Sequence, residues 1–291
     1  MEEPWVLAWA ALSVVSGGAS LAVLAVRRRT VRGTTLAAVW AWHAVAVIVL
    51  ASAGAAFVLI GADSMGRTQP VRFAAAVALF CPHMALLGAK RPQDRAWSWV
   101  VVSFWVVLAL PALEVAVLRP GQSLGIRDLR GAFLGVFILM ECVNRLGTGA
   151  WLSGVAFSIV QTMLLAEHLP FVRTELGLWA WPVASTIWFV GTAVMAWAAG
   201  RSRRGVSDRD RVWLAFRDAF GVLWALRAAE RLNSVAQHNG WPVRLAWNGL
   251  VSHPSPATHG DLSHRLAHLA PDSLDAYDRA LEYALAKHMR C

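Results

Sequence analysis

The sequence predicts an all-α fold, namely a polytopic helical membrane bundle of about seven transmembrane helices followed by a small, mainly helical cytoplasmic C-terminal tail. Two observations lead to this prediction. Of the 291 residues, 57% are hydrophobic and the mean hydropathy is +0.49, values that a soluble domain with an ordinary charged surface does not reach. The apolar residues also gather in runs close to the roughly 20 residues with which a helix crosses a hydrocarbon core of about 30 Å.

Seven apolar runs define the expected membrane domain, residues 1–206. The predicted spans are residues 5–26, 34–60, 71–89, 97–118, 129–146, 150–169 and 178–199. The fifth span is the weakest, because it is short and contains Glu141, Asn144 and Arg145; without it six spans remain. Tryptophans near the span ends match an interfacial aromatic belt: Trp5, Trp97, Trp99, Trp179, Trp181 and Trp197.

The short loops predict the orientation, since Lys and Arg concentrate on the cytoplasmic side of membrane proteins. Eleven lie after the first, third, fifth and seventh spans: Arg27, Arg28, Arg29, Arg32, Lys90, Arg91, Arg95, Arg145, Arg201, Arg203 and Arg204. Six lie in the opposite loops: Arg67, Arg72, Arg119, Arg127, Arg130 and Arg173. We therefore expect a multi-pass protein of a cell membrane of the bacterial inner-membrane type, with its N-terminus outside and its tail in the cytoplasm.

Residues 207–291 form the expected cytoplasmic tail. Ser207 can cap a helix that ends near Asn239 and Gly240, and a final helix is expected over residues 273–288. The first helix has one apolar face: Trp213, Phe216, Phe220, Leu223 and Trp224. This face either packs on the rest of the tail or lies along the inner leaflet. A tail of about 85 residues is close to the lower limit for an independent core, so we expect it to lean on the membrane domain.

The charge and the cysteines limit the expected partners. The net charge of +9 comes from arginines scattered through loops and tail, which favours contact with anionic lipid headgroups over nucleic acid. The expected partners are thus the lipid bilayer and a membrane or cytoplasmic protein that binds the tail. Cys81, Cys142 and Cys291 form no disulfide framework.

Polar residues inside spans are costly, so they are the first candidates for a functional site. The candidate intramembrane polar site consists of His43, Cys81, His83, Glu141, Asn144 and Arg145. His43 and His83 fall at similar depths on neighbouring spans, where two imidazoles could ligate a b-type haem or a transition metal. We favour the alternative that each imidazole hydrogen-bonds a neighbouring helix, and we expect no cofactor.

Cys81, Pro82 and His83 form a triplet within the third span. A proline in a span frees a carbonyl oxygen, so the triplet predicts a kinked helix with a buried thiol. The triplet is similar to the Cys-Pro-His sequence in a membrane helix of metal-pumping ATPases, which implies a site for copper or another soft metal. The similarity covers three residues only, since the sequence has no nucleotide-binding domain and no motif for a phosphorylated Asp.

Glu141 and Arg145 are spaced four residues apart, with the acid on the N-terminal side, which is the favourable order for a helical pair. We expect the two side chains to neutralise each other. The alternative is that they line an aqueous cavity with Asn144 and act as a proton or anion relay.

Two further groups lie elsewhere in the sequence. Glu114, Glu167 and His168 are expected as an outer polar group at the membrane interface, with water reaching it. In the tail, a spacing suited to Zn²⁺ is found at His259, Asp261, His264 and His268. A solvated loop and short helix is the favoured interpretation of this segment, because neither a Cys pair nor an HExxH pattern accompanies it.

The functional hypotheses belong to different classes. The leading one is a membrane scaffold or accessory subunit with a cytoplasmic interaction tail, because the sequence has few intramembrane charges, no repeat and no visible pair of broken helices. The second is transport or sensing of a small molecule or ion through His43, His83, Glu141 and Arg145. The third is a haem or metal protein. An enzyme is not favoured, since GxSxG, Walker and GxGxxG signatures are absent from the sequence.

Overall fold

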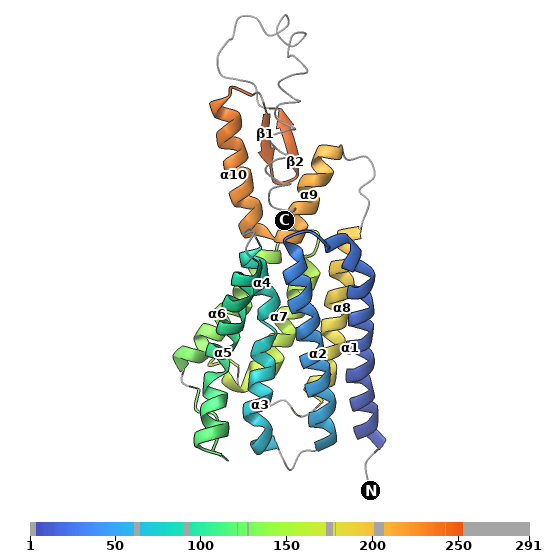
Figure 1. The fold of residues 1–291 in the computed structure, drawn as a ribbon, viewed down its shortest axis with the longest axis vertical. Helices are drawn as coiled ribbons and strands as arrows, with labels where there is room; N and C mark the ends of the chain where they lie inside the picture. The colour runs from blue at the N-terminus through green and yellow to red at the C-terminus, as the bar shows by residue number, and fades with distance from the viewer. Residues whose placement is uncertain are drawn as a thin grey trace, which may run out of the picture.

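The protein is described from a computed structural model, in which most residues are helical. The structure describes residues 4–60, 65–89, 94–120, 122–126, 128–172, 177, 179–200, 207–241 and 243–252. Long helices run side by side as a bundle, and a smaller group of elements stands on the end of the bundle opposite the N-terminus (Figure 1). The predicted all-helical class is confirmed, apart from one short hairpin.

The bundle contains the elements α1 (Pro4–Val31), α2 (Leu36–Ile60), α3 (Met65–Ala78), α4 (Cys81–Gly88), α5 (Asp94–Leu118), α6 (Asp128–Arg145), α7 (Trp151–Leu165), the 3₁₀ helix η2 (Ala166–His168) and α8 (Ala180–Gly200). Five segments are long and apolar enough to cross a membrane: Trp5–Val31, Leu36–Leu59, Thr68–Gly88, Ala96–Leu118 and Ala180–Gly200. They match the predicted spans 5–26, 34–60, 71–89, 97–118 and 178–199. These five segments are consistent with the predicted membrane-protein class.

The predicted spans 129–146 and 150–169 form helices, but neither is among these five segments. α6 carries Glu141 and Arg145 within 18 residues, and α7 has only 15 residues, fewer than the roughly 20 of a full crossing. The number of about seven spans therefore stays a prediction.

The segment Thr68–Gly88, which joins α3 and α4, is the centre of the bundle. In the 18-residue apolar stretch of this segment 78% is buried inside the protein, whereas the corresponding share is 28% to 39% in the other four segments. α3 packs against α5, α2 and α7, and α4 packs against α2 and α5. The other helices expose large apolar side chains, such as Val14, Ile48 and Val107, as helices in contact with lipid chains do.

The central helix is interrupted at Leu79 and Phe80. The backbone amides of these two residues bond to carbonyl oxygens only three residues back, at 3.2 Å each. Pro82 is the cause, because proline has no N–H and its ring displaces the carbonyl four residues earlier. The predicted kink at Cys81, Pro82 and His83 is confirmed, and it lies in the most buried part of the membrane domain.

The tail begins with two helices, where the sequence predicts one. Ser207 caps α9 (Asp208–Phe220) as expected, since its hydroxyl accepts from the amide of Asp210 at 3.1 Å. Gly221 then turns the chain with φ = 81°, a conformation that favours glycine, and α10 (Val222–His238) follows. α10 ends at His238 with Asn239 as its C-cap residue, next to the predicted end at Asn239 and Gly240. The predicted final helix over residues 273–288 lies outside the described residues.

A β-hairpin that the sequence analysis did not predict follows α10. β1 (Val243–Ala246) pairs antiparallel with β2 (Gly249–Ser252) across a two-residue turn, Trp247 and Asn248. The hairpin is held between the two tail helices. Asn233 of α10 bonds both the amide and the carbonyl of Leu245, and Asp210 of α9 accepts from the amide of Leu250 at 2.7 Å.

Most of the predicted apolar face of the tail packs against protein, although Leu223 is exposed. Trp213, Phe216 and Phe220 are buried in one cluster with Leu86 and Ala89 at the end of α4. α10 rises away from the bundle (Figure 1), which does not fit a helix lying along the leaflet. The expectation that the tail leans on the membrane domain is therefore confirmed for the described residues.

Candidate functional site

All six residues of the candidate intramembrane site are buried, with at most 7% of each residue exposed. His43 lies on α2, Cys81 and His83 lie on α4, and Glu141, Asn144 and Arg145 lie on the last turns of α6. The charge of Arg145 interacts electrostatically with His43, His83 and Glu141. Three helices thus bring ionisable side chains to one region at the tail end of the bundle.

Gln161 on α7 joins Glu141 to the break in the central helix. Its Nε2 donates to Glu141 Oε2 at 2.6 Å and to the backbone oxygen of Leu79 at 3.3 Å. Glu141 and Gln161 are both buried. The sequence analysis missed Gln161, although a single glutamine in an otherwise apolar run was a usable signal. The buried carboxyl group, the amide and the broken helix therefore form one polar centre.

His43 is engaged as a hydrogen-bond donor. Its Nε2 lies 2.9 Å from the hydroxyl oxygen of Thr192, and that hydroxyl donates to the backbone oxygen of Trp188 at 2.9 Å. Since the hydroxyl proton is directed to Trp188, the Nε2 of His43 carries the proton that it donates to Thr192. The ring also packs against Phe157 and Trp188, with centroids 5.3 Å away in each case. This nitrogen is thus not available to a metal, and the favoured helix-bonding role fits the geometry.

The two residues beside Pro82 lie in different surroundings. Cys81 is a buried free thiol packed with Ala85 and Val101. His83 is also buried, but its Nε2 has no hydrogen-bond partner, so this nitrogen does not make the expected bond to a neighbouring helix. Among the residues that the structure describes, no three His, Cys, Asp or Glu side chains gather as a metal site would require. The soft-metal hypothesis therefore gains nothing from this arrangement.

Asn144 connects the membrane domain to the tail. Its Oδ1 accepts from the backbone amide of Leu223 at 3.1 Å. Leu223 is the second residue of α10, whose own N-cap residue, Gly221, has no side chain to offer. Asn144 therefore performs the N-cap role across the interface, which satisfies one of the free amides of the first helical turn. The close approach also requires Gly221, because an added Cβ there would lie 2.5 Å from Asn144 Nδ2.

Arg145 does not form the ion pair expected with Glu141. Both side chains are buried, yet no nitrogen of Arg145 lies within 4 Å of a Glu141 oxygen. The Nε atom of Arg145 is buried without a hydrogen-bond partner. The stem of the side chain crosses Gly154 of α7, where an added Cβ would come within 2.8 Å of Arg145 Cγ. The two charges interact electrostatically, but the direct side-chain pair that the helical spacing suggested is not formed.

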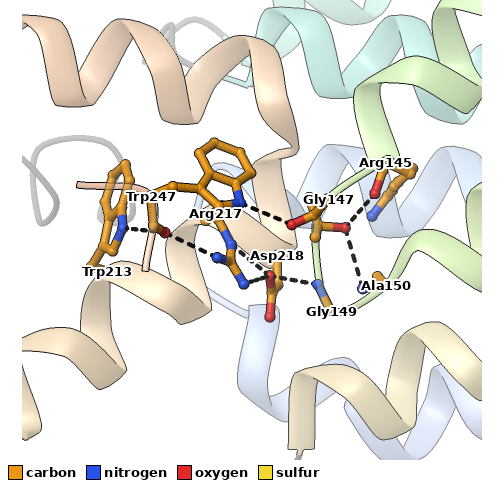
Figure 2. A network of polar contacts seen from close by, with 9 residues as sticks. Arg145, Gly147, Gly149, Ala150, Trp213, Arg217, Asp218 and Trp247 are labelled. Carbon is orange, nitrogen blue, oxygen red and sulfur yellow. Dashed lines mark hydrogen bonds and ion pairs between the residues drawn. The ribbon is translucent and has the colours of Figure 1, made fainter. Parts of the chain in front are cut away.

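The corner between α6 and α7 is held by the tail (Figure 2). Asp218 Oδ1 accepts from the amide of Gly149 at 2.8 Å and from Nε and Nη2 of Arg217 at 3.1 and 3.0 Å. Arg217 Nη1 donates to the backbone oxygen of Trp247 at 3.0 Å, and its guanidinium lies 5.1 Å from the centroid of the Trp247 ring. Trp247 Nε1 in turn donates to the backbone oxygen of Gly147 at 3.0 Å. None of these contacts was predicted.

The structure separates the predicted outer polar group into two parts. Glu167 pairs with Arg72 at 3.7 Å and accepts from Gln69 at 3.3 Å, and the ring of His168 packs edge-on against that of Phe73. Glu114 is exposed and pairs at 3.4 Å with Arg119, the residue that follows its helix α5. No described contact joins Glu114 to Glu167 or His168, so these residues are not one site.

The candidate zinc residues of the tail, His259, Asp261, His264 and His268, lie outside the described residues. The prediction is neither supported nor contradicted by the structure.

Comparison with known proteins adds no relative. No family, curated protein or solved structure matches the chain. The chemistry of the buried residues is therefore the basis on which a function is inferred.

Proposed function

We propose that the protein is a membrane transporter or sensor of a small molecule or ion, working through the polar centre at Glu141, Gln161 and the break in the central helix. The observation that supports this most is the position of the break. It lies in the most buried of the apolar segments, and the Leu79 oxygen at the break shares a hydrogen-bond donor with Glu141.

Broken membrane helices have a physical reason to bind solutes. The end of a half-helix presents carbonyl groups without their usual intrahelical partners and a partial charge in a low-dielectric interior. An ionisable side chain in the same place adds a group that can take up a proton or pair with a charged ligand. Glu141 is such a group, and it has no described cation within 4 Å.

The break in the central helix weakens the scaffold hypothesis. That hypothesis rested on a sequence without visible broken helices, and α3 and α4 now form one. The scaffold hypothesis also includes a tail that binds a partner. An ordered tail supports this part of the hypothesis, because Asp218, Trp247 and Asn144 hold the tail on the bundle by hydrogen bonds. A scaffold or accessory subunit that displays this docked tail is therefore our second candidate function. Seven spans, an outside N-terminus and a cytoplasmic tail complete the proposal.

Glu141→Gln tests the first candidate, since glutamine keeps the size of the side chain but cannot ionise. The matched control is Glu114→Gln, which changes an exposed acid on another helix. The purified proteins are heated with alkali-metal chlorides, phosphate, small carboxylates and amino acids, while tryptophan fluorescence reports unfolding. Uptake of each stabilising solute into proteoliposomes is then measured.

We expect at least one solute to raise the Tm of wild type and control by about 5 °C at a concentration near 100 times its Kd. Glu141→Gln should lose this effect while remaining folded in the membrane. Equal responses of all three proteins to every solute would remove the proposal and leave the scaffold function.

A further inference from the structure

Arg145 is a buried charge that the described residues leave unpaired. Only 7% of the residue is exposed, it lies at the end of α6, and its stem is pressed against Gly154 of α7. Neither a hydrogen bond nor an ion pair of its guanidinium is formed within the described part of the chain. An unpaired ion in a low-dielectric interior is strongly destabilising, so a partner for this group is expected.

The carboxylates around Arg145 are already engaged elsewhere. Glu141 and Asp218 interact electrostatically with its charge, but neither comes within 4 Å. Glu141 accepts from Gln161, and Asp218 Oδ1 accepts three hydrogen bonds from Gly149 and Arg217. The protein thus places negative charge near Arg145 without giving it a direct ligand.

Two neighbouring side chains also lack partners. Asn144 Nδ2 is buried and unbonded, and its Oδ1 is fixed by the amide of Leu223, so the free atom is a donor. His83 Nε2 is buried and unbonded, and His83 interacts electrostatically with Arg145. Among the described residues of this region, the unpartnered donors Asn144 Nδ2 and Arg145 Nε, together with the positive charge, outweigh the unpartnered acceptor Gln161 Oε1. Such an excess of donors suits an anion.

We infer that Arg145 binds an oxyanion, a carboxylate or a phosphate group, at the junction of α6, α7 and the tail. The planar guanidinium can donate two parallel hydrogen bonds to two oxygens of such a group, and His83 can add a further bond. The inference rests on the proposed transport or sensing function and names its ligand class. The anion is either a free solute or the headgroup phosphate of an anionic lipid, since Arg145 ends a helix at the tail end of the bundle.

The test uses the full chain, with Arg72→Gln as the matched control. Arg72 is also a buried arginine, with 9% exposed, but it has Glu167 as its partner. Wild type, Arg145→Gln, Arg145→Lys and the control are titrated with sodium phosphate and sodium acetate at constant ionic strength, against sodium chloride. Calorimetry gives the Kd, and tryptophan fluorescence gives the Tm. The thermal measurement is repeated in nanodiscs of phosphatidylglycerol and of phosphatidylcholine.

For a free anion, we expect phosphate or acetate to raise the Tm of wild type and control by several degrees over chloride, and Arg145→Gln to lose this rise. For a lipid phosphate, phosphatidylglycerol should stabilise wild type and control only, whatever the soluble salt. Arg145→Lys keeps the charge but not the two parallel donors, so its affinity should fall about tenfold. Equal responses of the four proteins to both salts and both lipids would overturn the inference, as would a Lys variant that binds as tightly as wild type.

The anion site and the proposed function can fail separately. If Arg145→Gln loses anion binding while Glu141→Gln responds to every solute as wild type does, the anion site stands and transport or sensing through Glu141 does not. If Glu141→Gln loses a solute response that Arg145→Gln keeps in full, the function stands and the ligand class is wrong.

Discussion

Arg72 and Arg145 are buried arginines on different helices of the same membrane domain, and they are treated differently by their surroundings. Arg72 lies on α3 and pairs with Glu167, which follows α7. Arg145 lies on α6 near two acids and pairs with neither. Arg72 has an acidic partner within 4 Å, and that partner keeps access to water, although the Nε atom of Arg72 is buried without a hydrogen bond. Arg145 has no acidic partner at this distance, and an unpaired charge in a membrane interior points to a functional site.

A third arginine shows that the tail end of the bundle is able to satisfy a buried charge. Arg217, on α9, bonds Asp218 through two nitrogens and the backbone of Trp247 through a third. The same acid is near Arg145 but gives it no bond. The difference between the two arginines is thus a matter of placement and not of missing acids. Substitutions that disrupt the bonded Arg217 should therefore lower the stability of the protein, whereas removal of the unpaired Arg145 should not.

Asp218→Asn should cause the largest loss of stability. The change leaves Arg217 as a buried charge without its carboxylate and weakens the bond to Gly149, and breaking such a pair costs about 3–5 kcal/mol. Because Asp218 holds the tail on the α6–α7 corner, the tail should be cleaved faster in limited proteolysis. Asp208→Asn, which alters an exposed pair with Arg211, serves as the control and should leave cleavage unchanged. Equal cleavage of the two variants would contradict the view that this network docks the tail.

Gly221→Ala should be next in size. Its φ of 81° is unfavourable for alanine, and the new Cβ would meet the side chain and the carbonyl of Asn144 at 2.5 Å. We expect a loss of about 2–4 kcal/mol, from backbone strain and overpacking together. Gly240→Ala separates the two causes, because Gly240 has φ = 65° and open space around it. It should lose only about 1 kcal/mol. Thermal unfolding of both variants measures the difference, and equal losses would mean that contact with Asn144 is unimportant.

Arg145→Met should leave the stability of the protein unchanged or raise it. Methionine replaces an unpaired buried charge by an apolar chain of similar length, and such exchanges are neutral or stabilising by about 1–3 kcal/mol. Arg72→Met should instead destabilise by about 1 kcal/mol, since Glu167 loses its partner but keeps access to water. The Tm values are compared in anion-free buffer. A clear loss of stability in Arg145→Met would show that Arg145 is a structural residue like Arg72.

The membrane helices were predictable because their signal is local. A run of about 20 apolar residues identifies a span without any knowledge of its neighbours, and Pro82 alone indicates the break in the central helix. The helix break at Gly221 and the hairpin turn at Trp247 and Asn248 also had local signals in the sequence, namely a glycine within a helical pattern and an Asn-Gly dipeptide that overlaps the turn. The sequence analysis passed over both of these signals.

The connections of the candidate site were not predictable in this way. Asn144 was recognised as a polar residue in a span, but its partner, Leu223, is 79 residues away and offers a backbone amide that any residue would have. Gln161 reaches a carbonyl 82 residues away, for the same kind of reason. Helical spacing suggested a pair between Glu141 and Arg145, whereas packing against α7 and the tail decided where each side chain points. Tertiary contacts therefore overrode local preference where the polar residues meet.

Asn144→Ala should have the smallest effect and the most local one. Loss of an N-cap acceptor costs about 1 kcal/mol, so the amides of the first turn of α10 should exchange with solvent about fivefold faster. Hydrogen exchange of a peptide that covers Leu223 measures this change. Asn239→Ala is the control, because Asn239 is an exposed residue at the other end of α10 and bonds the oxygen of Val235. Unchanged exchange around Leu223 would mean that the tail helix does not depend on α6, and that the polar centre has no direct connection to the tail through Asn144.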